Sequence, residues 1–234
     1  MTSLSKNARI GGLLYIVGSL FGVVRLLYIP SALFVHGNAA ATASNIVAHE
    51  MLFRFGIVTY LIGSTLWIFV TLALYRLFKD VDHMLAVLTV ILGSLMVVPL
   101  FFVNTVNDAA TLLFARGTDF VSVFDKPQRE AFVLLFLNLH NQLDLANGIF
   151  WGLWLLPLGL LVYKSRFLPR ILGVLLVIAC FGYLAFSLTA FLFPAYQDAV
   201  GRITSVTNLA EVAFMLWLAI LGAKAPRLTP ARVR

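Results

Sequence analysis

Residues 171–193 read ILGVLLVIACFGYLAFSLTAFLF and contain no charged side chain. A helix that crosses the ~30 Å hydrocarbon core of a bilayer needs about 20 predominantly apolar residues, which this stretch supplies. Its hydrophobicity is nearly continuous, whereas a strand of a membrane β-barrel would alternate between apolar and polar positions. A helix also satisfies its own backbone hydrogen bonds within lipid. The stretch therefore predicts a transmembrane helix.

The rest of the chain has the same character. Of its 234 residues, 61% are hydrophobic and 12% are charged, whereas soluble domains have about 45–50% apolar and about 25% charged residues. This composition excludes a soluble domain and predicts an all-α membrane protein, a six-transmembrane-helix bundle that forms one polytopic domain over residues 1–234. The expected helices are 10–29, 50–76, 84–114, 128–163, 170–193 and 203–223.

The distribution of charge predicts the orientation. The chain has 17 Lys and Arg against 10 Asp and Glu, and most of the basic residues lie at the two termini and in the loops 77–83 and 164–169 with their flanking helix ends. Such an excess marks the cytoplasmic side of membrane proteins, so we expect both termini to be cytoplasmic. The expected partner is the lipid bilayer and not nucleic acid. The sequence carries no indicator of oligomeric state.

Two of the expected helices are longer than a ~30 Å core requires at ~1.5 Å per residue. Residues 128–139 either continue the fourth helix beyond the membrane or lie along its surface, and the sequence leaves both possibilities open. Asp125 followed by Gln128 has the spacing of a capping box and predicts the start of this helix. Pro99 and Pro157 fall inside helices and are expected to kink them.

Polar side chains gather at the outer ends of the expected helices. Ionisable groups inside a span cost ~2.5–3.5 kcal/mol at the bilayer centre, so they usually face the bundle interior or water. Arg25 shares a helical face with Gly18 and Gly22, which permit close helix contact and should turn it inward. We expect the polar faces of five helices to converge into one outward-facing cluster. The candidate ligand-binding residues are Arg25, Glu50, Arg54, Asn104, Asp108, His140, Asp144, Asn147, Asn208 and Glu211.

Three functions are compatible with this cluster. It could simply fasten helices together, or it could bind a small polar or anionic ligand, including a lipid headgroup, because arginine holds carboxylate or phosphate with two hydrogen bonds. The third is a membrane-embedded metal-dependent hydrolase acting near the outer leaflet. Its motif is a lone His-x-x-x-Asp pair, His140 and Asp144. A divalent metal is the one cofactor considered, and its candidate ligands are His49, Asp108, His140, Asp144 and Glu211.

Three segments carry a family resemblance. They are Arg9-x-Gly11-Gly12-x-x-Tyr15, the run ALYRLF at 73–78, and the region 140–173 with His140, Phe150-Trp151-Gly152-Leu153, Gly159, Lys164-Ser165 and Pro169-Arg170-x-Leu172-Gly173. Together they resemble a bacterial multi-pass membrane protein family of unknown function. The resemblance implies a helical protein of the bacterial cell (inner) membrane and no particular activity. The resemblance supports His140 as a site residue. It does not support Asp144 and Asn147, because the family has apolar residues at these two positions.

Overall fold

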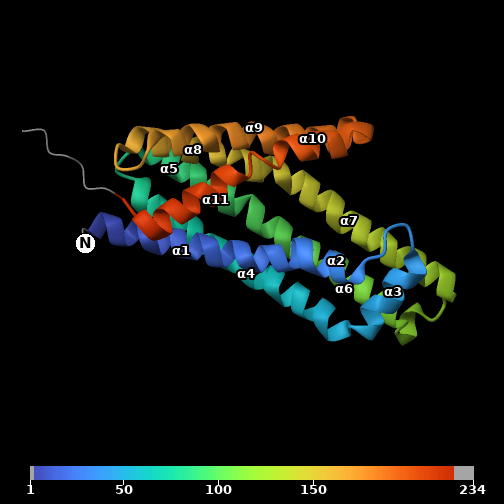
Figure 1. Cartoon of the computed structure of the whole chain (residues 1–234). Coiled ribbons are helices and arrows are strands. Elements are labelled where there is room, and N and C mark those ends of the chain that lie inside the picture. Colours follow the sequence, from blue (N-terminus) through green and yellow to red (C-terminus); the bar gives the residue numbers. More distant parts are fainter. Residues whose placement is uncertain (1–2, 224–234) are drawn as a thin grey trace, which may run out of the picture.

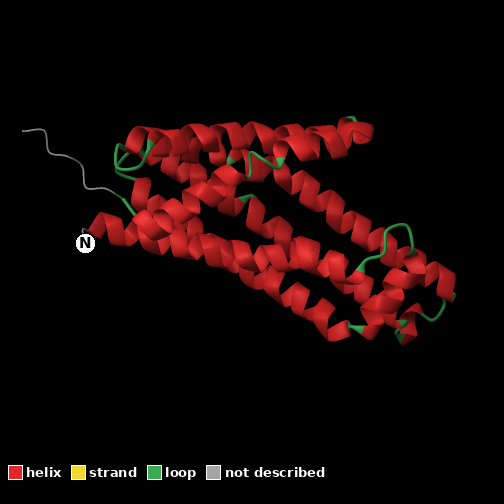
Figure 2. Cartoon of the chain, viewed as in Figure 1, coloured by secondary structure: helices red, strands yellow, loops and turns green. Residues whose placement is uncertain are grey.

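The computed structural model describes residues 3–223, and within them the chain is helical without a strand (Figure 2). Six helices in these residues are long and apolar enough to cross a membrane. The prediction of an all-α six-helix membrane protein is therefore confirmed. The six spans are Ser3–Leu33, Glu50–Phe78, His83–Arg116, Lys126–Ser165, Arg170–Leu192 and Pro194–Leu221.

Most spans consist of several helical segments, and a short helix, α3 (Ala39–Ala48), follows the first of them. Spans two and five are single helices, α4 (Glu50–Phe78) and α9 (Arg170–Leu192). Span one consists of α1 (Ser3–Val23), η1 (Val24–Tyr28) and α2 (Ile29–Leu33), and span three of α5 (His83–Val90), η2 (Ile91–Leu95) and α6 (Val97–Arg116). Span four consists of α7 (Lys126–Leu153) and α8 (Leu155–Ser165). Span six consists of η4 (Pro194–Tyr196), α10 (Gln197–Thr204), α11 (Leu209–Leu216) and η5 (Trp217–Leu221).

Prolines explain most of these interruptions. Proline lacks a backbone N–H and its ring crowds the carbonyl four residues earlier. The π-helical segments η1 and η2 precede Pro30 and Pro99, and a turn at Trp154 precedes Pro157. The first helix, expected to end at residue 29, continues to Leu33 because the wider π turn accommodates Pro30 without ending the helix.

Side chains cap the starts of α7 and α5, and the cap of α7 is the one that the sequence predicts. Asp125 and Gln128 form the capping box that begins α7, and residues 128–139 continue this helix without a break. At the start of α5, Asp82 accepts a hydrogen bond from the Leu85 amide at 3.2 Å and another from Lys164 Nζ at 2.8 Å. The bond from Lys164 lowers the pKa of Asp82.

The spans are arranged as antiparallel pairs, and the sixth crosses between them. Figure 1 shows the start of α1 and the end of span six at one end of the bundle, which we call the terminal end; the opposite end, where α3 lies, is the far end. Helix α1 packs on α4, α6 on α7, and α8 on α9. Span six begins alongside α9 through α10 and finishes against α1 through η5. Its helix is broken at residues 205–208, between these two contacts.

The apolar core is divided into two parts. One cluster lies toward the terminal end and includes Tyr15, Val70 and Trp154. A smaller cluster lies at the far end and includes Phe53 and Val133. On span two and on span four, the residues of the two clusters are separated by more than ten positions. Polar side chains occupy this intervening depth.

Candidate functional site

A buried ion pair occupies the gap between the two apolar clusters. Arg25 is 2% exposed and Asp108 is fully buried. Arg25 Nε donates to Asp108 Oδ2 at 3.0 Å, and Arg25 Nη2 donates to Asp108 Oδ1, so the guanidinium binds the carboxylate with two hydrogen bonds. Arg25 lies in the π-helical segment η1, and such segments occur frequently at functional sites. The pair joins span one to span three.

His140 extends this pair to a second carboxylate. On one side of its ring, Nδ1 lies 3.0 Å from Asp108 Oδ1 and 3.2 Å from Arg25 Nη2. On the other side, Nε2 lies 3.3 Å from Asp144 Oδ2, one helical turn further along α7. The ring is 4% exposed. His140 therefore lies between Asp108 and Asp144, with one ring nitrogen facing each carboxylate.

Asp144 is the carboxylate of this group that is not fully enclosed. Its side chain is 13% exposed, and its Oδ1 accepts hydrogen bonds from Tyr60 Oη at 2.7 Å and from Asn104 Nδ2 at 3.0 Å. Asn104 Nδ2 also donates to the His140 carbonyl at 3.0 Å. Spans one to four thus each contribute to one connected group, which we call the polar cluster: Arg25, Tyr60, Asn104, Asp108, His140 and Asp144.

Several candidate residues lie outside the polar cluster. Asn147 is buried and donates from Nδ2 to the Val97 carbonyl at 3.3 Å, which ties α7 to span three. Glu50 and Arg54 form a partly exposed pair at 2.7 Å, and Arg116 Nε approaches Glu50 at 3.4 Å. His49 and Asn208 are exposed.

Glu211 forms a second, separate polar group with two tyrosines. Its Oε1 accepts from Tyr183 Oη at 2.8 Å, and its Oε2 accepts from Tyr15 Oη. Tyr15 precedes Arg25 by ten residues, which is about 15 Å along a helix. The single outward belt expected from the sequence is therefore divided between two depths. The reason is that span six begins at Pro194, well before the expected residue 203, so Glu211 lies deeper in the bundle.

The candidate metal ligands do not converge. Within residues 3–223, no three His, Cys, Asp or Glu side chains are placed to hold one metal ion. The two nitrogens of His140 face different carboxylates, and Asp108 is already bound by Arg25. His49 and Glu211 lie elsewhere, His49 exposed at the end of α3. The geometry of the described residues thus gives no support to the metal-dependent hydrolase.

Three cavities that share lining residues lie beside the two polar groups. The far cavity, of about 630 Å³, is lined by Arg25, His140, Asn141 and Asp144 among others. Asn141 and Asp144 also line the middle cavity, of about 360 Å³, which lies between α1, α7, α9 and the broken part of span six. The middle cavity shares Tyr183 with the inner cavity, of about 190 Å³, which reaches Glu211. A series of cavities therefore extends from the far end toward the middle of the bundle.

Comparison with known proteins identifies the family. A family model described as a domain of unknown function (DUF4386) matches residues 10–222. The chain belongs to the DUF4386 family. Every residue of the polar cluster, and Glu211 with its two tyrosines, lies within the part of the chain that matches the DUF4386 model. The expected membership of a multi-pass membrane family of unknown function is confirmed.

A relative from Archaeoglobus fulgidus, named as an uncharacterized protein, is 41% identical to this DUF4386 chain over 85 residues. The match covers 36% of this chain and 49% of the relative, so the chain matches about half the length of that protein. No solved structure matches the chain.

Tyrosines complete both polar groups, and sequence reasoning did not assign them a role. Tyr60 binds Asp144, while Tyr15 and Tyr183 bind Glu211. Each lies within a largely apolar helix, where a tyrosine is usually interpreted as packing. A buried tyrosine hydroxyl nevertheless usually finds a hydrogen-bond partner, and this requirement is the signal that could have linked these residues to the carboxylates.

Proposed function

We propose that the protein binds a small polar molecule or lipid headgroup in its far and middle cavities, through an ammonium group or another strong hydrogen-bond donor. The observation that carries this proposal is the position of Asp144. Its partly exposed carboxylate lines both cavities, and it is the acidic side chain shared by them. An ionised carboxylate has about four acceptor sites, so Asp144 keeps acceptor capacity for a ligand.

The charges of the polar cluster favour a ligand that donates hydrogen bonds over an anionic ligand. Arg25 already binds Asp108 with two hydrogen bonds, so its charge is neutralised within the protein. Arg54 pairs with Glu50 and does not line the far or the middle cavity. The arginines that suggested an anionic ligand are thus committed to other partners, whereas Asp144 offers negative charge toward the cavities.

The middle cavity suits an amphiphilic ligand. One of its walls is formed by apolar side chains such as Leu26, Leu27 and Phe186. The same cavity contains Ser187, whose buried hydroxyl has no hydrogen-bond partner among the described residues. With the termini in the cytoplasm, as the basic residues favour, the far cavity opens toward the outer side of the membrane. Both an outer-leaflet lipid and a dissolved amine could then reach Asp144.

The test compares three probes on the detergent-purified protein. Oleoyl lysophosphatidylethanolamine represents the lipid source, ethanolamine the dissolved source, and oleoyl lysophosphatidylglycerol provides the same acyl chain and phosphate without the amine. We expect at least one amine probe to bind, measured by calorimetric titration, and Asp144→Asn to weaken it about 10- to 100-fold. Such a loss corresponds to the ~1.5–3 kcal/mol of a hydrogen bond to a charged group.

The matched control is Glu50→Gln, which removes a carboxylate from the partly exposed pair with Arg54. This variant should bind the amine probe as the wild-type protein does. Lysophosphatidylethanolamine without ethanolamine binding would identify the lipid as the source, and the reverse result would identify the dissolved amine. Binding that is unchanged in Asp144→Asn, or that is equally strong for lysophosphatidylglycerol, would overturn the proposal.

A further inference from the structure

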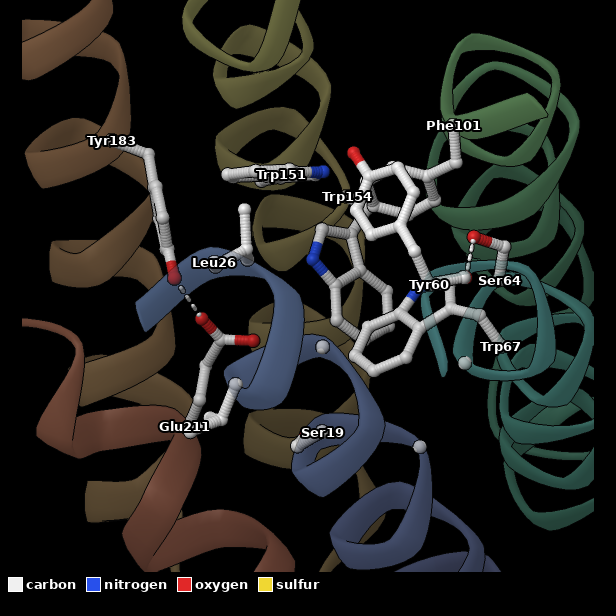
Figure 3. A pocket seen from close by; sticks show the side chains of 14 residues that line it. Ser19, Leu26, Tyr60, Ser64, Trp67, Phe101, Trp151, Trp154, Tyr183 and Glu211 are labelled. Carbon is white, nitrogen blue, oxygen red and sulfur yellow. Dashed lines mark hydrogen bonds between the residues drawn. The ribbon is translucent and has the colours of Figure 1, made fainter. Parts of the chain in front are cut away.

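The inner cavity is lined mainly by aromatic rings, and Tyr60 is the residue that it shares with the polar cluster. Figure 3 shows that the labelled rings surround the cavity, with Glu211 at its edge. Two tryptophans, Trp67 and Trp154, pack edge to face with ring centroids 5.5 Å apart. The six aromatic residues that line the cavity are Tyr60, Trp67, Phe101, Trp151, Trp154 and Tyr183.

Glu211 is the charged side chain of this cavity. Each of its oxygens accepts one tyrosine hydroxyl, Tyr183 on Oε1 and Tyr15 on Oε2, and these bonds fix the direction of the carboxylate. Figure 3 shows the bond to Tyr183 at the cavity wall. A carboxylate has about four acceptor sites, so two tyrosine bonds leave room for a ligand on the cavity side.

No basic side chain of residues 3–223 lies within ion-pair distance of Glu211. This differs from the polar cluster, where Arg25 neutralises Asp108. An unpaired charge inside a membrane protein is costly, and such groups mark ligand or ion sites. The faces of tryptophan and tyrosine rings also attract cations electrostatically, most strongly quaternary ammonium groups. Carboxylate and rings thus favour the same kind of ligand.

We infer that the inner cavity is a binding site for a small organic cation of the quaternary ammonium class. The cation lies against the aromatic rings and supplies the positive charge that Glu211 lacks within the described residues. The cavity volume of about 190 Å³ limits the ligand to a small headgroup. This site is independent of the ligand proposed for the far and middle cavities, because it uses Glu211 and not Asp144.

The experiment uses choline and its neutral isostere 3,3-dimethyl-1-butanol on the full-length protein in detergent. Three of the four tryptophans of the chain line the inner cavity, so intrinsic tryptophan fluorescence responds to its occupancy. Trp151 also lines the middle cavity, so the effect of Glu211→Gln on the signal assigns it to the inner cavity. We expect choline to change this fluorescence in a saturable manner and to bind at least about tenfold more tightly than the isostere, since only choline gains the cation–π and ionic contributions.

The variant Glu211→Gln keeps the shape of the side chain and removes its charge, so it should weaken choline binding several-fold while the aromatic rings keep a smaller preference for choline over the isostere. Glu50→Gln is the control and should bind choline as the wild-type protein does. Equal binding of choline and the isostere by the wild-type protein would overturn the inference, and this comparison does not require any variant to fold. A choline affinity that is unchanged in Glu211→Gln, or no saturable choline response in the wild-type protein, would also overturn it.

The proposal for the far and middle cavities and the inference for the inner cavity can be refuted independently of each other. Loss of ethanolamine or lysophosphatidylethanolamine binding in Asp144→Asn concerns the far and middle cavities. A choline signal that depends on Glu211 concerns the inner cavity, because Glu211 does not line the other two.

Discussion

Asp108→Asn is expected to lower the free energy of unfolding by about 3–5 kcal/mol, which is typical of breaking a buried ion pair by removing one partner. The substitution preserves the size of the side chain and removes the charge that neutralises Arg25. Arg25 is 2% exposed and would be left as an uncompensated cation between the two apolar clusters. Unfolding of the purified protein by increasing SDS in mixed micelles, followed by circular dichroism, measures the change.

Two comparisons show whether the loss comes from the buried charge. Glu50→Gln breaks a partly exposed pair, which should be worth less than about 1 kcal/mol. The double variant Arg25→Gln/Asp108→Asn removes both charges, so its loss should be clearly smaller than the sum of the two single losses. Equal and small losses in Asp108→Asn and Glu50→Gln would contradict the burial of the Arg25–Asp108 pair.

Gly173→Ala is expected to lower the free energy of unfolding by up to about 3 kcal/mol through overpacking. Helix α9 touches α8 here with almost no space between the backbones. A Cβ atom at Gly173 would lie 2.5 Å from the carbonyl oxygen of Gly159 and 2.8 Å from the amide nitrogen of Tyr163. Both are backbone atoms, so the helices must separate to accept one methyl group. The same SDS titration measures the loss.

Gly22→Ala is the matched control, because a Cβ atom at Gly22 would meet no atom within 4 Å. In a helix interior alanine is about 1 kcal/mol more favourable than glycine, so this variant should be as stable as the wild-type protein or more so. A Gly173→Ala variant that loses no more stability than Gly22→Ala would contradict the close contact between α8 and α9.

The spans could be predicted because hydrophobicity is nearly continuous along them, and the start of α7 because Asp125 and Gln128 form a local motif. Span six was only partly predicted. Helix α10 contains Asp198 and Arg202, so its sequence is typical of a polar loop. Pro194 directly follows the expected fifth helix, 170–193, but in the structure it is the first residue of span six. A polar helix that lies along α9 cannot be recognised by hydrophobicity alone.

The candidate site shows the same limit. Helical spacing placed His140 and Asp144 on one face and turned Arg25 inward, and these side chains do meet in the polar cluster. Spacing along one helix does not tell which helix lies opposite, so Asp108 could not be assigned to Arg25. For the same reason Glu211 could not be separated from this group: its tyrosine partners lie on spans one and five, 196 and 28 positions away along the chain.

The most direct test of the central proposal is the reactivity of a cysteine at position 141. Asn141 is exposed and lines both cavities that Asp144 shares, and the native Cys180 is buried, so the wild-type protein is the unreactive control. In spheroplasts, Asn141→Cys should react with membrane-impermeant methanethiosulfonates. Each rate is divided by the rate of the same reagent with free 2-mercaptoethanol, and this normalised rate should be higher for the cationic ethyltrimethylammonium reagent than for the anionic ethylsulfonate. Lys164→Cys, at the terminal end, should react only after permeabilisation. An unreactive Cys at 141, a normalised rate that is equal or higher for the anionic reagent, or labelling at 164 in intact spheroplasts would contradict an outward-opening cavity with negative charge.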